Sequence, residues 1–224
     1  MSDMKTDFIP SLHGFSFVNC FPGYPLPPLI STLPGISKIL STFQINHGLC
    51  GGMCFATHDF FLAKKTIALD TTVPKPGTPL YRYLYQRQLD TYGSCWKFVA
   101  KFAQWTVLPD STVQSLTYKE LEKVTAQLDK GQAVILGLVY VSIADTLAIW
   151  FNHQVLAYDY SQEQKIIKVK IYDPNFPCQD DVFIEIKRAF NGLQCKQKVF
   201  STGKEIPIRG FFVMPYAPVS PLII

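Results

Sequence analysis

Residues 153–173 read HQVLAYDYSQEQKIIKVKIYD, and this stretch predicts a β-hairpin. Side chains alternate between the two faces of a strand. The first arm therefore places a mostly apolar set on one face: His153, Val155, Ala157 and Asp159. The second arm places a similar set on one face and two lysines on the other: Ile167, Val169, Ile171 and Asp173 against Lys168 and Lys170. The hairpin is the best starting point for the β half of the chain.

The register of this hairpin is predicted from the same alternation. If residues 161–165 form a five-residue loop, the numbers of paired residues sum to 326, and His153 lies directly opposite Asp173. A register one residue away would bring lysines to the apolar face, which is costly. A register two residues away would place Asn175 or Ile171 opposite the histidine instead. We therefore expect Asp173 to accept a hydrogen bond from the imidazole, with Asn175 as the alternative.

The remaining elements divide into helices followed by strands. Hydrophobic periodicity predicts helices over residues 50–65, 79–90, 94–105 and about 117–131. In the last of these, Thr117 and Glu120 form a capping box, and Gly131 ends the helix. Strands are predicted over residues 133–141, 153–160, 166–172, 182–186, 196–201 and 208–215. Helices first and strands second, without alternation, predict an α+β fold.

Length and composition predict a single domain with a large core. The chain has 224 residues, of which 48% are hydrophobic and 17% are charged, against a usual charged share of about 25%. We expect residues 1–224 to form one domain, with a helical lobe over about 40–131 and a β lobe over about 132–216. A net charge of +4 without long basic runs argues against nucleic acid as a partner.

The sequence also predicts a cytoplasmic protein without a membrane span. The N-terminal residues MSDMKTDFIP do not resemble a signal peptide. Residues 133–151 are largely apolar, but Ser142 and Asp145 interrupt them, and a buried strand followed by a loop fits better than a span. We expect the six cysteines to be reduced thiols.

The segment QINHGLCGGMCFA, residues 44–56, carries the strongest chemical signal. Cys50 begins a predicted helix, where unpaired backbone N–H groups and the helix dipole favour a thiolate nucleophile. Gly51 and Gly52 would leave room for a substrate backbone. Gln44, six residues upstream, could donate to an oxyanion together with the backbone N–H of Cys50. Cys54 is the alternative nucleophile, although we expect it to pack in the core.

Among the four histidines, His153 is the best candidate for the base that a nucleophilic cysteine needs. His47 is too close to Cys50 in the chain to be placed, and His58 is expected to be buried and hydrogen-bonded. Cys50, Cys54 and His58 are spaced four apart and could form a metal site, but one straight helix cannot supply tetrahedral geometry. We therefore expect no metal and no cofactor.

The order Gln44, Cys50, His153 and Asp173 resembles that of papain-like cysteine peptidases, including the six-residue spacing from glutamine to cysteine. The run CGGMC resembles the corresponding run of bacteriocin leader peptidase domains. A bacterial papain-like family related to these domains is similar over most of the chain: FVNCFPGYP, GLCGGMCFA, PLYRYLYQRQLD, NHQVLAYDY, YDPN and RGFFVMPY. Papain itself has a tryptophan after the nucleophile, where this chain has Gly51.

This resemblance implies a two-lobed papain-like fold and a cysteine hydrolase, most simply a thiol peptidase. Cys50 would be the nucleophile, His153 the base, Asp173 the residue that orients the ring, and Gln44 an oxyanion donor. The substrate would be a peptide or protein. The same triad and thioester serve deamidases, acyltransferases and transglutaminases, and an inactive binding module could keep the fold. The sequence leaves these alternatives and the oligomeric state open.

Overall fold

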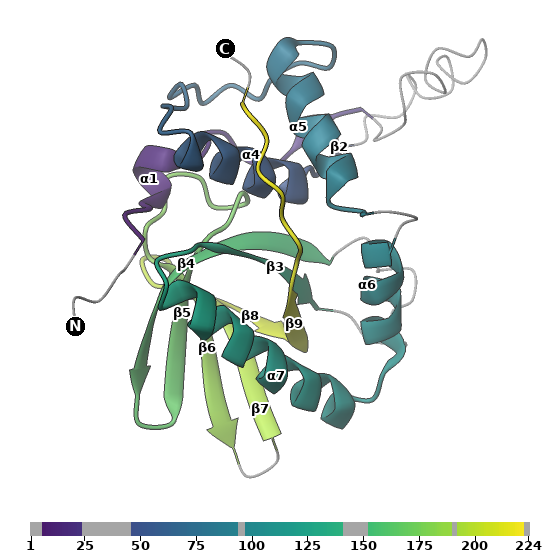
Figure 1. Cartoon of the computed structure of the whole chain (residues 1–224), viewed down its shortest axis with the longest axis vertical. Coiled ribbons are helices and arrows are strands. Elements are labelled where there is room, and N and C mark those ends of the chain that lie inside the picture. The colour runs from purple at the N-terminus through teal and green to yellow at the C-terminus, as the bar shows by residue number, and fades with distance from the viewer. Residues whose placement is uncertain (1–5, 24–45, 94–96, 141–151, 190–191, 222–224) are drawn as a thin grey trace.

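The computed structural model describes residues 6–23, 46–93, 97–140, 152–189 and 192–221. Within these residues the chain forms a group of helices packed against a curled antiparallel sheet (Figure 1). The expected mixture of helices and an antiparallel sheet is therefore present. The helices precede the strands along the chain, apart from two very short strands near the N-terminus.

The described residues include five helices and a small ribbon, most of which lie above the sheet or to its right in Figure 1, while the last helix lies across the sheet. The helices are α1 (Pro10–His13), α4 (Cys50–Leu62), α5 (Pro79–Asp90), α6 (Lys97–Val107) and α7 (Asp110–Leu128). The ribbon pairs β1 (Phe21–Pro22) with β2 (Asn46–His47). It brings the segment around Phe21 next to the residues that precede α4.

Seven strands form one sheet in the order β8-β7-β6-β5-β4-β3-β9, and every described pair is antiparallel. Their bounds are β3 (Val134–Val139), β4 (His153–Glu163), β5 (Ile166–Tyr172), β6 (Val182–Ala189), β7 (Gly192–Val199), β8 (Lys204–Ile208) and β9 (Gly210–Val213). β8 and β9 lie at opposite edges of the sheet, yet only Arg209 separates them. One residue spans less than about 4 Å, so the sheet must curl until its two edges meet at this corner.

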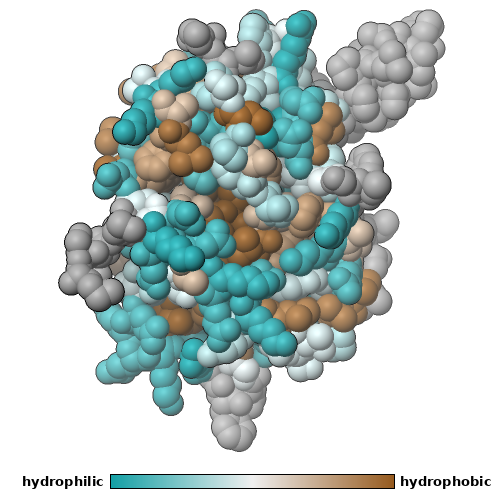
Figure 2. All heavy atoms as spheres, viewed as in Figure 1, coloured by the Kyte–Doolittle hydropathy of each residue, from teal (hydrophilic) through white to brown (hydrophobic). Residues whose placement is uncertain are grey.

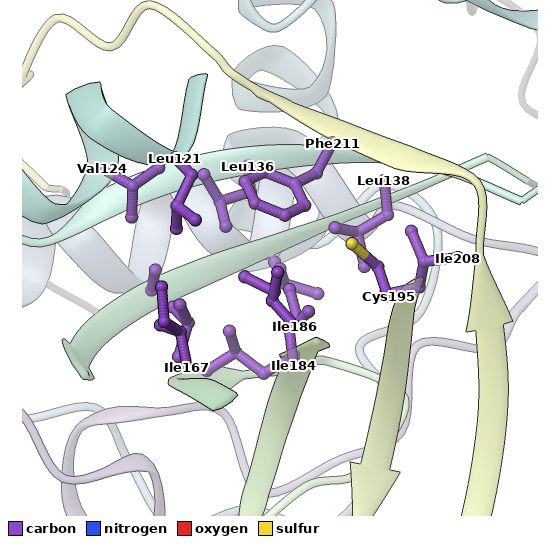
Figure 3. Packing of buried hydrophobic residues seen from close by; sticks show 14 of the residues in the cluster. Leu121, Val124, Leu136, Leu138, Ile167, Ile184, Ile186, Cys195, Ile208 and Phe211 are labelled. Atoms are coloured by element: carbon purple, nitrogen blue, oxygen red, sulfur yellow. The ribbon is translucent and has the colours of Figure 1, made fainter. Parts of the chain in front are cut away.

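The inside of this curl holds the main core, which α7 closes from one side (Figure 3). Leu121 and Val124 of α7 point toward side chains from β3, β5, β6 and β7, and all are nearly inaccessible to solvent. Figure 3 shows these side chains converging from several strands: Leu136, Leu138, Ile167, Ile184, Ile186, Cys195, Ile208 and Phe211. The expected stripe of Leu121, Val124 and Leu128 is thus the buried face of α7.

The start of α7 differs from the sequence prediction. The helix begins at Asp110, so Thr117 lies in its interior and its hydroxyl donates to the Val113 carbonyl at 2.7 Å. The capping-box prediction was wrong because a buried threonine can bond back to its own helix, which no local pattern distinguishes from capping. At the other end Gly131 adopts a positive φ of 70° and closes the helix as expected.

The other boundaries shift by a few residues. α5 matches its prediction, α4 ends at Leu62, and the described part of α6 runs to Val107. β8 was not predicted, and the single strand expected over 208–215 corresponds to β9 alone. The run 133–141 is a buried strand over Val134–Val139, while residues 141–151 lie outside the described residues. No helix in the described ranges is long and apolar enough to cross a membrane.

The hairpin of β4 and β5 has the expected strands but a different register. Its turn contains only Gln164 and Lys165, and Gln164 has the positive φ of 52° that short hairpin turns favour. The register then shifts between Ala157 and Asp159, which indicates a β-bulge. The bulge turns Asp159 to the side of Lys170, and the two charged groups lie 3.1 Å apart. The prediction that Asp159 shares the face of His153 was therefore wrong.

The changed register still brings His153 to Asp173. Leu156 pairs with Tyr172, so continuing this register places Asp173 opposite Val155 instead of His153. His153 lies two residues before Val155 on the same face and reaches Asp173 diagonally. The predicted face was right, although the predicted pairing was two residues away from the observed one.

Candidate active site

Cys50 is the first residue of α4, and its side chain is half-buried. The backbone N–H of Leu49 donates to Asn19 Oδ1 at 2.6 Å, and that of Gly52 donates to Gln88 Oε1 at 2.9 Å. Among the described residues, no acceptor is found for the N–H groups of Cys50 and Gly51. The helix start therefore presents free backbone donors beside the thiol, as the sequence predicts.

His153 links Cys50 to Asp173. Its Nε2 lies 2.6 Å from Asp173 Oδ1, and its side chain is also hydrogen-bonded to Cys50. Because Nε2 faces the carboxylate, Nδ1 is the ring nitrogen left for the thiol. His153 and Asp173 are 6% and 1% exposed, so water barely reaches this pair. The structure thus brings together three of the four residues that the sequence singled out.

The surroundings of His153 favour its protonated form. Burial would lower the pKa of His153, but the charges of Asp173 and Cys50, and hydrogen bonds to both, raise that pKa to about 10. The imidazole is therefore poised to carry a proton at neutral pH. A proton held between a thiol and a carboxylate can be passed to either neighbour or to a third group bound beside them.

Asp173 and Asn175 have different positions around this ring. The backbone N–H of Asn175 donates to Asp173 Oδ1 at 2.8 Å, and its side-chain amide lies 3.3 Å from His153 Nε2. Asp173 is the nearer partner by 0.7 Å, since its Oδ1 lies at 2.6 Å. Asn175 therefore supports the carboxylate that contacts the ring.

Two residues that sequence analysis did not identify complete the environment of Asp173. Gln197 Nε2 on β7 donates to Asp173 Oδ2, and the Tyr140 hydroxyl donates to Gln197 Oε1 at 2.6 Å. The backbone N–H of Tyr140 donates in turn to Asn152 Oδ1 at 3.2 Å, immediately before His153 in the chain. A hydrogen-bonded series thus runs from the thiol through the imidazole, carboxylate and amide to the phenol.

Asn19 connects the cysteine helix to the loop that follows Asp173. Its Oδ1 accepts from Leu49 N, its Nδ2 donates to Asn175 Oδ1 at 3.1 Å, and its backbone N–H donates to the Pro174 carbonyl at 3.0 Å. A Cβ at Gly48 would lie 2.9 Å from Asn19 Nδ2, so a larger residue at this position would displace the Asn19 amide. No sequence signal marks Asn19, since its partners lie about 30 and 156 residues away.

Gly51 and Gly52 serve the packing of α4, which corrects the expectation that they leave room for a substrate. A Cβ on Gly52 would lie 2.1 Å from the Leu84 carbonyl oxygen of α5. A Cβ on Gly51 would lie 2.6 Å from the side chain of Gln154, whose amide donates to Thr91 Oγ1 at 3.3 Å. Both glycines are buried because α5 and β4 approach the first turn of α4 from two sides.

Cys54 differs sharply from Cys50 although it lies one turn further along α4. It is fully buried, and its thiol donates to the Gln154 carbonyl at 3.4 Å. Burial, with further contributions from Cys50 and Asp173, raises the pKa of Cys54 well above its ordinary value. Cys54 therefore stays a protonated core thiol, whereas Cys50 faces the imidazole.

The other two histidines considered with Cys50 have separate surroundings. His58 is buried as expected, but its Nδ1 has no hydrogen-bond partner among the described residues, and its ring stacks on Tyr216 at 4.3 Å. His47 lies next to the ribbon, with Nδ1 2.9 Å from the Gly23 carbonyl and Nε2 3.2 Å from the Tyr81 hydroxyl. In the described part of the chain no three His, Cys, Asp or Glu side chains are grouped as metal ligands.

Some residues of the sequence prediction fall outside the described residues. Gln44, the proposed oxyanion donor, is one of these, and Cys95 is another. The five other cysteines are all free thiols: Cys20, Cys50, Cys54, Cys178 and Cys195. Cys20 and Cys178 are exposed and are not part of the hydrogen-bonded series.

A cavity of about 480 Å³ lies at the opposite end of α4 from Cys50. It lies between the last turn of α4, the turn after α7 and the segment that follows β9. In Figure 2 hydrophobic atoms are visible in a hollow above the polar surface of α7. Because its α4 residues are His58, Phe61 and Leu62, this cavity is separate from the Cys50 site.

Comparison of the chain with models of known protein families, with curated proteins and with solved structures gave no match. The geometry of the described residues is therefore the basis for the functional argument.

Proposed function

We propose that this protein is a cysteine hydrolase with a papain-like two-lobed fold, acting on the carbonyl of a peptide or amide. Cys50 is the nucleophile, His153 the acid and base, and Asp173 the residue that orients the imidazole. The substrate class and the family remain those that the sequence resemblance implies. The observation that carries the proposal is that His153 is hydrogen-bonded to both Cys50 and Asp173.

Two features of this contact support catalysis instead of simple packing. The thiol is half-buried at a helix start, whereas the histidine and carboxylate behind it are almost inaccessible. The raised pKa of His153, about 10, favours an imidazolium at neutral pH, which can stabilise negative charge on the neighbouring sulfur as it develops. A thiolate is the reactive form of cysteine, so this pair is prepared to attack a carbonyl.

The reaction can be written with residues of this chain alone. The Cys50 sulfur attacks the carbonyl carbon and forms a C–S bond, while the carbonyl π electrons move to the oxygen. The tetrahedral intermediate collapses, the C–N bond breaks, and the imidazolium of His153 gives its proton to the leaving amine. Water then attacks the thioester with His153 as the base, which releases the acid and regenerates the thiol.

The free N–H groups at the start of α4 support stabilisation of the negative oxygen. The backbone N–H of Cys50 is one donor, and the partial positive charge of the helix start acts in the same direction. Gln44 is proposed as the second donor from its position in the sequence. The order of helices and sheet supports the two-lobed arrangement, since Cys50 belongs to a helix, His153 begins β4 of the sheet, and Asp173 directly follows β5.

Selective labelling tests this proposal. With a limiting amount of iodoacetamide or an epoxide probe at pH 7, we expect modification of Cys50 well before the exposed thiols Cys20 and Cys178. Tandem mass spectrometry distinguishes Cys50 from Cys54, and the Cys50→Ala variant should lose the rapid reaction. Equal labelling of all accessible thiols, or slower labelling of Cys50 than of Cys20, would contradict the proposal.

A peptide library identifies the reaction itself. Incubation with the wild-type protein should yield cleaved peptides, detected by mass spectrometry, that are absent with Cys50→Ala. Loss of ammonia from intact glutamine-containing peptides would identify a deamidase instead. No product despite rapid labelling of Cys50 would favour a binding module.

A further inference from the structure

Gln197 is a polar residue on the inward face of a β-strand whose other inward residues are apolar. Leu193, Cys195 and Val199 of β7 are buried in the core inside the curled sheet, and Gln197 between them is only 1% exposed. A buried amide in such surroundings is costly unless its donor and acceptor are both used. Its position therefore calls for a specific explanation.

Both ends of the Gln197 amide have partners, and these partners define its orientation. Nε2 donates to Asp173 Oδ2, while Oε1 accepts from the Tyr140 hydroxyl at 2.6 Å. A phenol at this site must be protonated in order to donate. Burial, together with the charges of Asp173 and Cys50, raises the pKa of Tyr140, which keeps the hydroxyl protonated. The phenol thereby fixes the amide with its NH₂ group toward the carboxylate.

The carboxylate of Asp173 is held through both oxygens. Oδ1 accepts from His153 and from the Asn175 backbone, and Oδ2 accepts from Gln197. A carboxylate held only through Oδ1 could rotate about its terminal bond and lose the geometry toward the ring. Gln197 comes from β7, which is two strands away from β5 in the sheet, so it anchors Asp173 to a separate part of the core.

We propose that Gln197 and Tyr140 are positioning residues of the Cys50 site, which hold the Asp173 carboxylate oriented toward His153. This inference rests on the proposed function of Cys50. Gln197 acts through Asp173, and Tyr140 acts through Gln197 by preventing the amide from turning its oxygen toward the carboxylate. Neither residue is assigned a contact with substrate.

The variant Gln197→Glu tests this role through its pH dependence. Among the described residues, the titratable groups in the hydrogen-bonded series that includes Gln197 are Asp173, His153, Cys50 and Tyr140. When protonated, the new carboxyl can donate to Asp173 as the amide does; when ionised, it repels that carboxylate. We expect iodoacetamide to label Cys50 at close to the wild-type rate near pH 5, and at least tenfold more slowly than wild type once the new carboxyl ionises.

Gln194→Glu is the matched control. Gln194 lies on the same strand, but its side chain is exposed, so the same chemical change should leave the labelling profile unaltered. A merely structural role of Gln197 would lower the melting temperature of Gln197→Glu yet leave the pH profile of labelling parallel to that of the wild type. That result would overturn the inference.

Two further variants keep the test decisive if Gln197→Glu is poorly folded. Gln197→Leu should slow labelling at pH 7 about 10-fold to 100-fold, the factor expected for losing one hydrogen bond to a charged group. Tyr140→Phe should slow it less, and Tyr160→Phe, whose hydroxyl donates to exposed Asp129, should not slow it. Wild-type rates in folded Gln197→Leu and Tyr140→Phe would also overturn the inference.

The outcome separates this inference from the proposed function. If wild-type Cys50 is not labelled selectively, the hydrolase proposal fails. If it is labelled selectively but the variants at 197 and 140 behave as wild type, only the positioning role fails.

Discussion

Asp59 and Asp173 are both almost completely buried carboxylates, each 1% exposed, but their partners differ in kind. Asp59 faces Arg87, with Nε at 2.8 Å from Oδ2 and Nη2 at 3.1 Å from Oδ1. Tyr83, Tyr216 and the backbone of Val219 donate to the same carboxylate. Asp173 faces instead a histidine, whose other partner is the half-buried thiol of Cys50.

This difference separates a structural ion pair from a candidate catalytic one. Arginine remains charged at any ordinary pH, and the guanidinium of Arg87 is enclosed between Phe55 and Tyr216. The hydrogen bonds around Asp59 connect α4, α5 and the segment after β9. They hold that segment against the helices, which it crosses in Figure 1. Histidine can release its proton, and the other partner of His153 is the thiol of Cys50. Burial alone therefore does not mark the reactive site.

The largest expected effect concerns His153→Ala. Loss of the imidazolium should slow iodoacetamide labelling of Cys50 at pH 7 about 100-fold to 10,000-fold, the contribution typical of a positioned acid or base. His47→Ala is the control, because His47 also lies close to Cys50 in the chain but contacts Gly23 and Tyr81. If both variants slow the labelling of Cys50 equally, measured per folded molecule, then His153 has no special role at the thiol.

Asp59→Ala should show the opposite behaviour. Removing the carboxylate leaves the buried charge of Arg87 without its partner, so we expect a loss of about 3–5 kcal/mol in the free energy of unfolding. Urea denaturation measures this loss. Asp90→Ala removes the more exposed partner of Arg87 and should cost at most about 1 kcal/mol. Cys50 of folded Asp59→Ala should be labelled at the wild-type rate. Slower labelling would mean that the residues around Asp59 affect the Cys50 site.

Asp173→Asn tests the electrostatic part of the comparison. The charge of Asp173 is the largest of the contributions that raise the pKa of His153. Without it, the midpoint of the His153 titration, followed by NMR of the ring C–H signals, should move from about 10 toward the ordinary value of 6.5. An unchanged midpoint would mean that Cys50 alone sustains the imidazolium.

The effect that is smallest per pH unit is a pH dependence of stability, which has opposite signs in the two regions. The raised pKa of His153 contributes stability that is complete below pH 6.5 and is lost as pH rises toward about 10. Burial lowers the pKa of His58, beside Asp59 and Arg87, to about 4, so its unfavourable protonation destabilises the fold as pH falls from 6.5 to 4.

Denaturant unfolding across this pH range checks both signs. His58→Gln should reduce the slope of the unfolding free energy against pH between pH 6.5 and 4 by up to about 1.4 kcal/mol per pH unit, which is the limit for one proton. Above pH 6.5, the unfolding free energy of this variant should depend on pH as it does in the wild type. If His58→Gln leaves this slope unchanged between pH 6.5 and 4, other groups determine the pH dependence of stability in that range.

Much of the chemistry could be predicted because it depends on local spacing and alternation. Cys50 at a helix start and His153 on a face shared with Asp173 follow from neighbouring residues and from strand periodicity. The pairing itself could not be predicted correctly, since a two-residue turn and the bulge near Asp159 changed the register. The bulge turns Asp159 out to Lys170, an ion pair that the alternation pattern does not contain.

The supporting residues could not be predicted for a different reason. Gln197 could have been noticed as the one polar residue among the inward positions of β7, but the predicted strand began at 196 instead of Gly192. Asn19 and Tyr140 carry no comparable signal. Their partners are remote in the chain, and only packing of α4 against the sheet brings them together.

The sequence by itself determined most of the helices and strands and singled out Cys50, His153 and Asp173, because helix starts and strand faces depend on interactions within a few residues. The tertiary structure decided that the buried carboxylate of Asp59 faces Arg87 and that Gln197 and Tyr140 complete the surroundings of Asp173. It also decided that Gly51 and Gly52 accommodate Gln154 and α5. Such contacts depend on how the sheet curls and where its edges meet, and this geometry is set by the whole core.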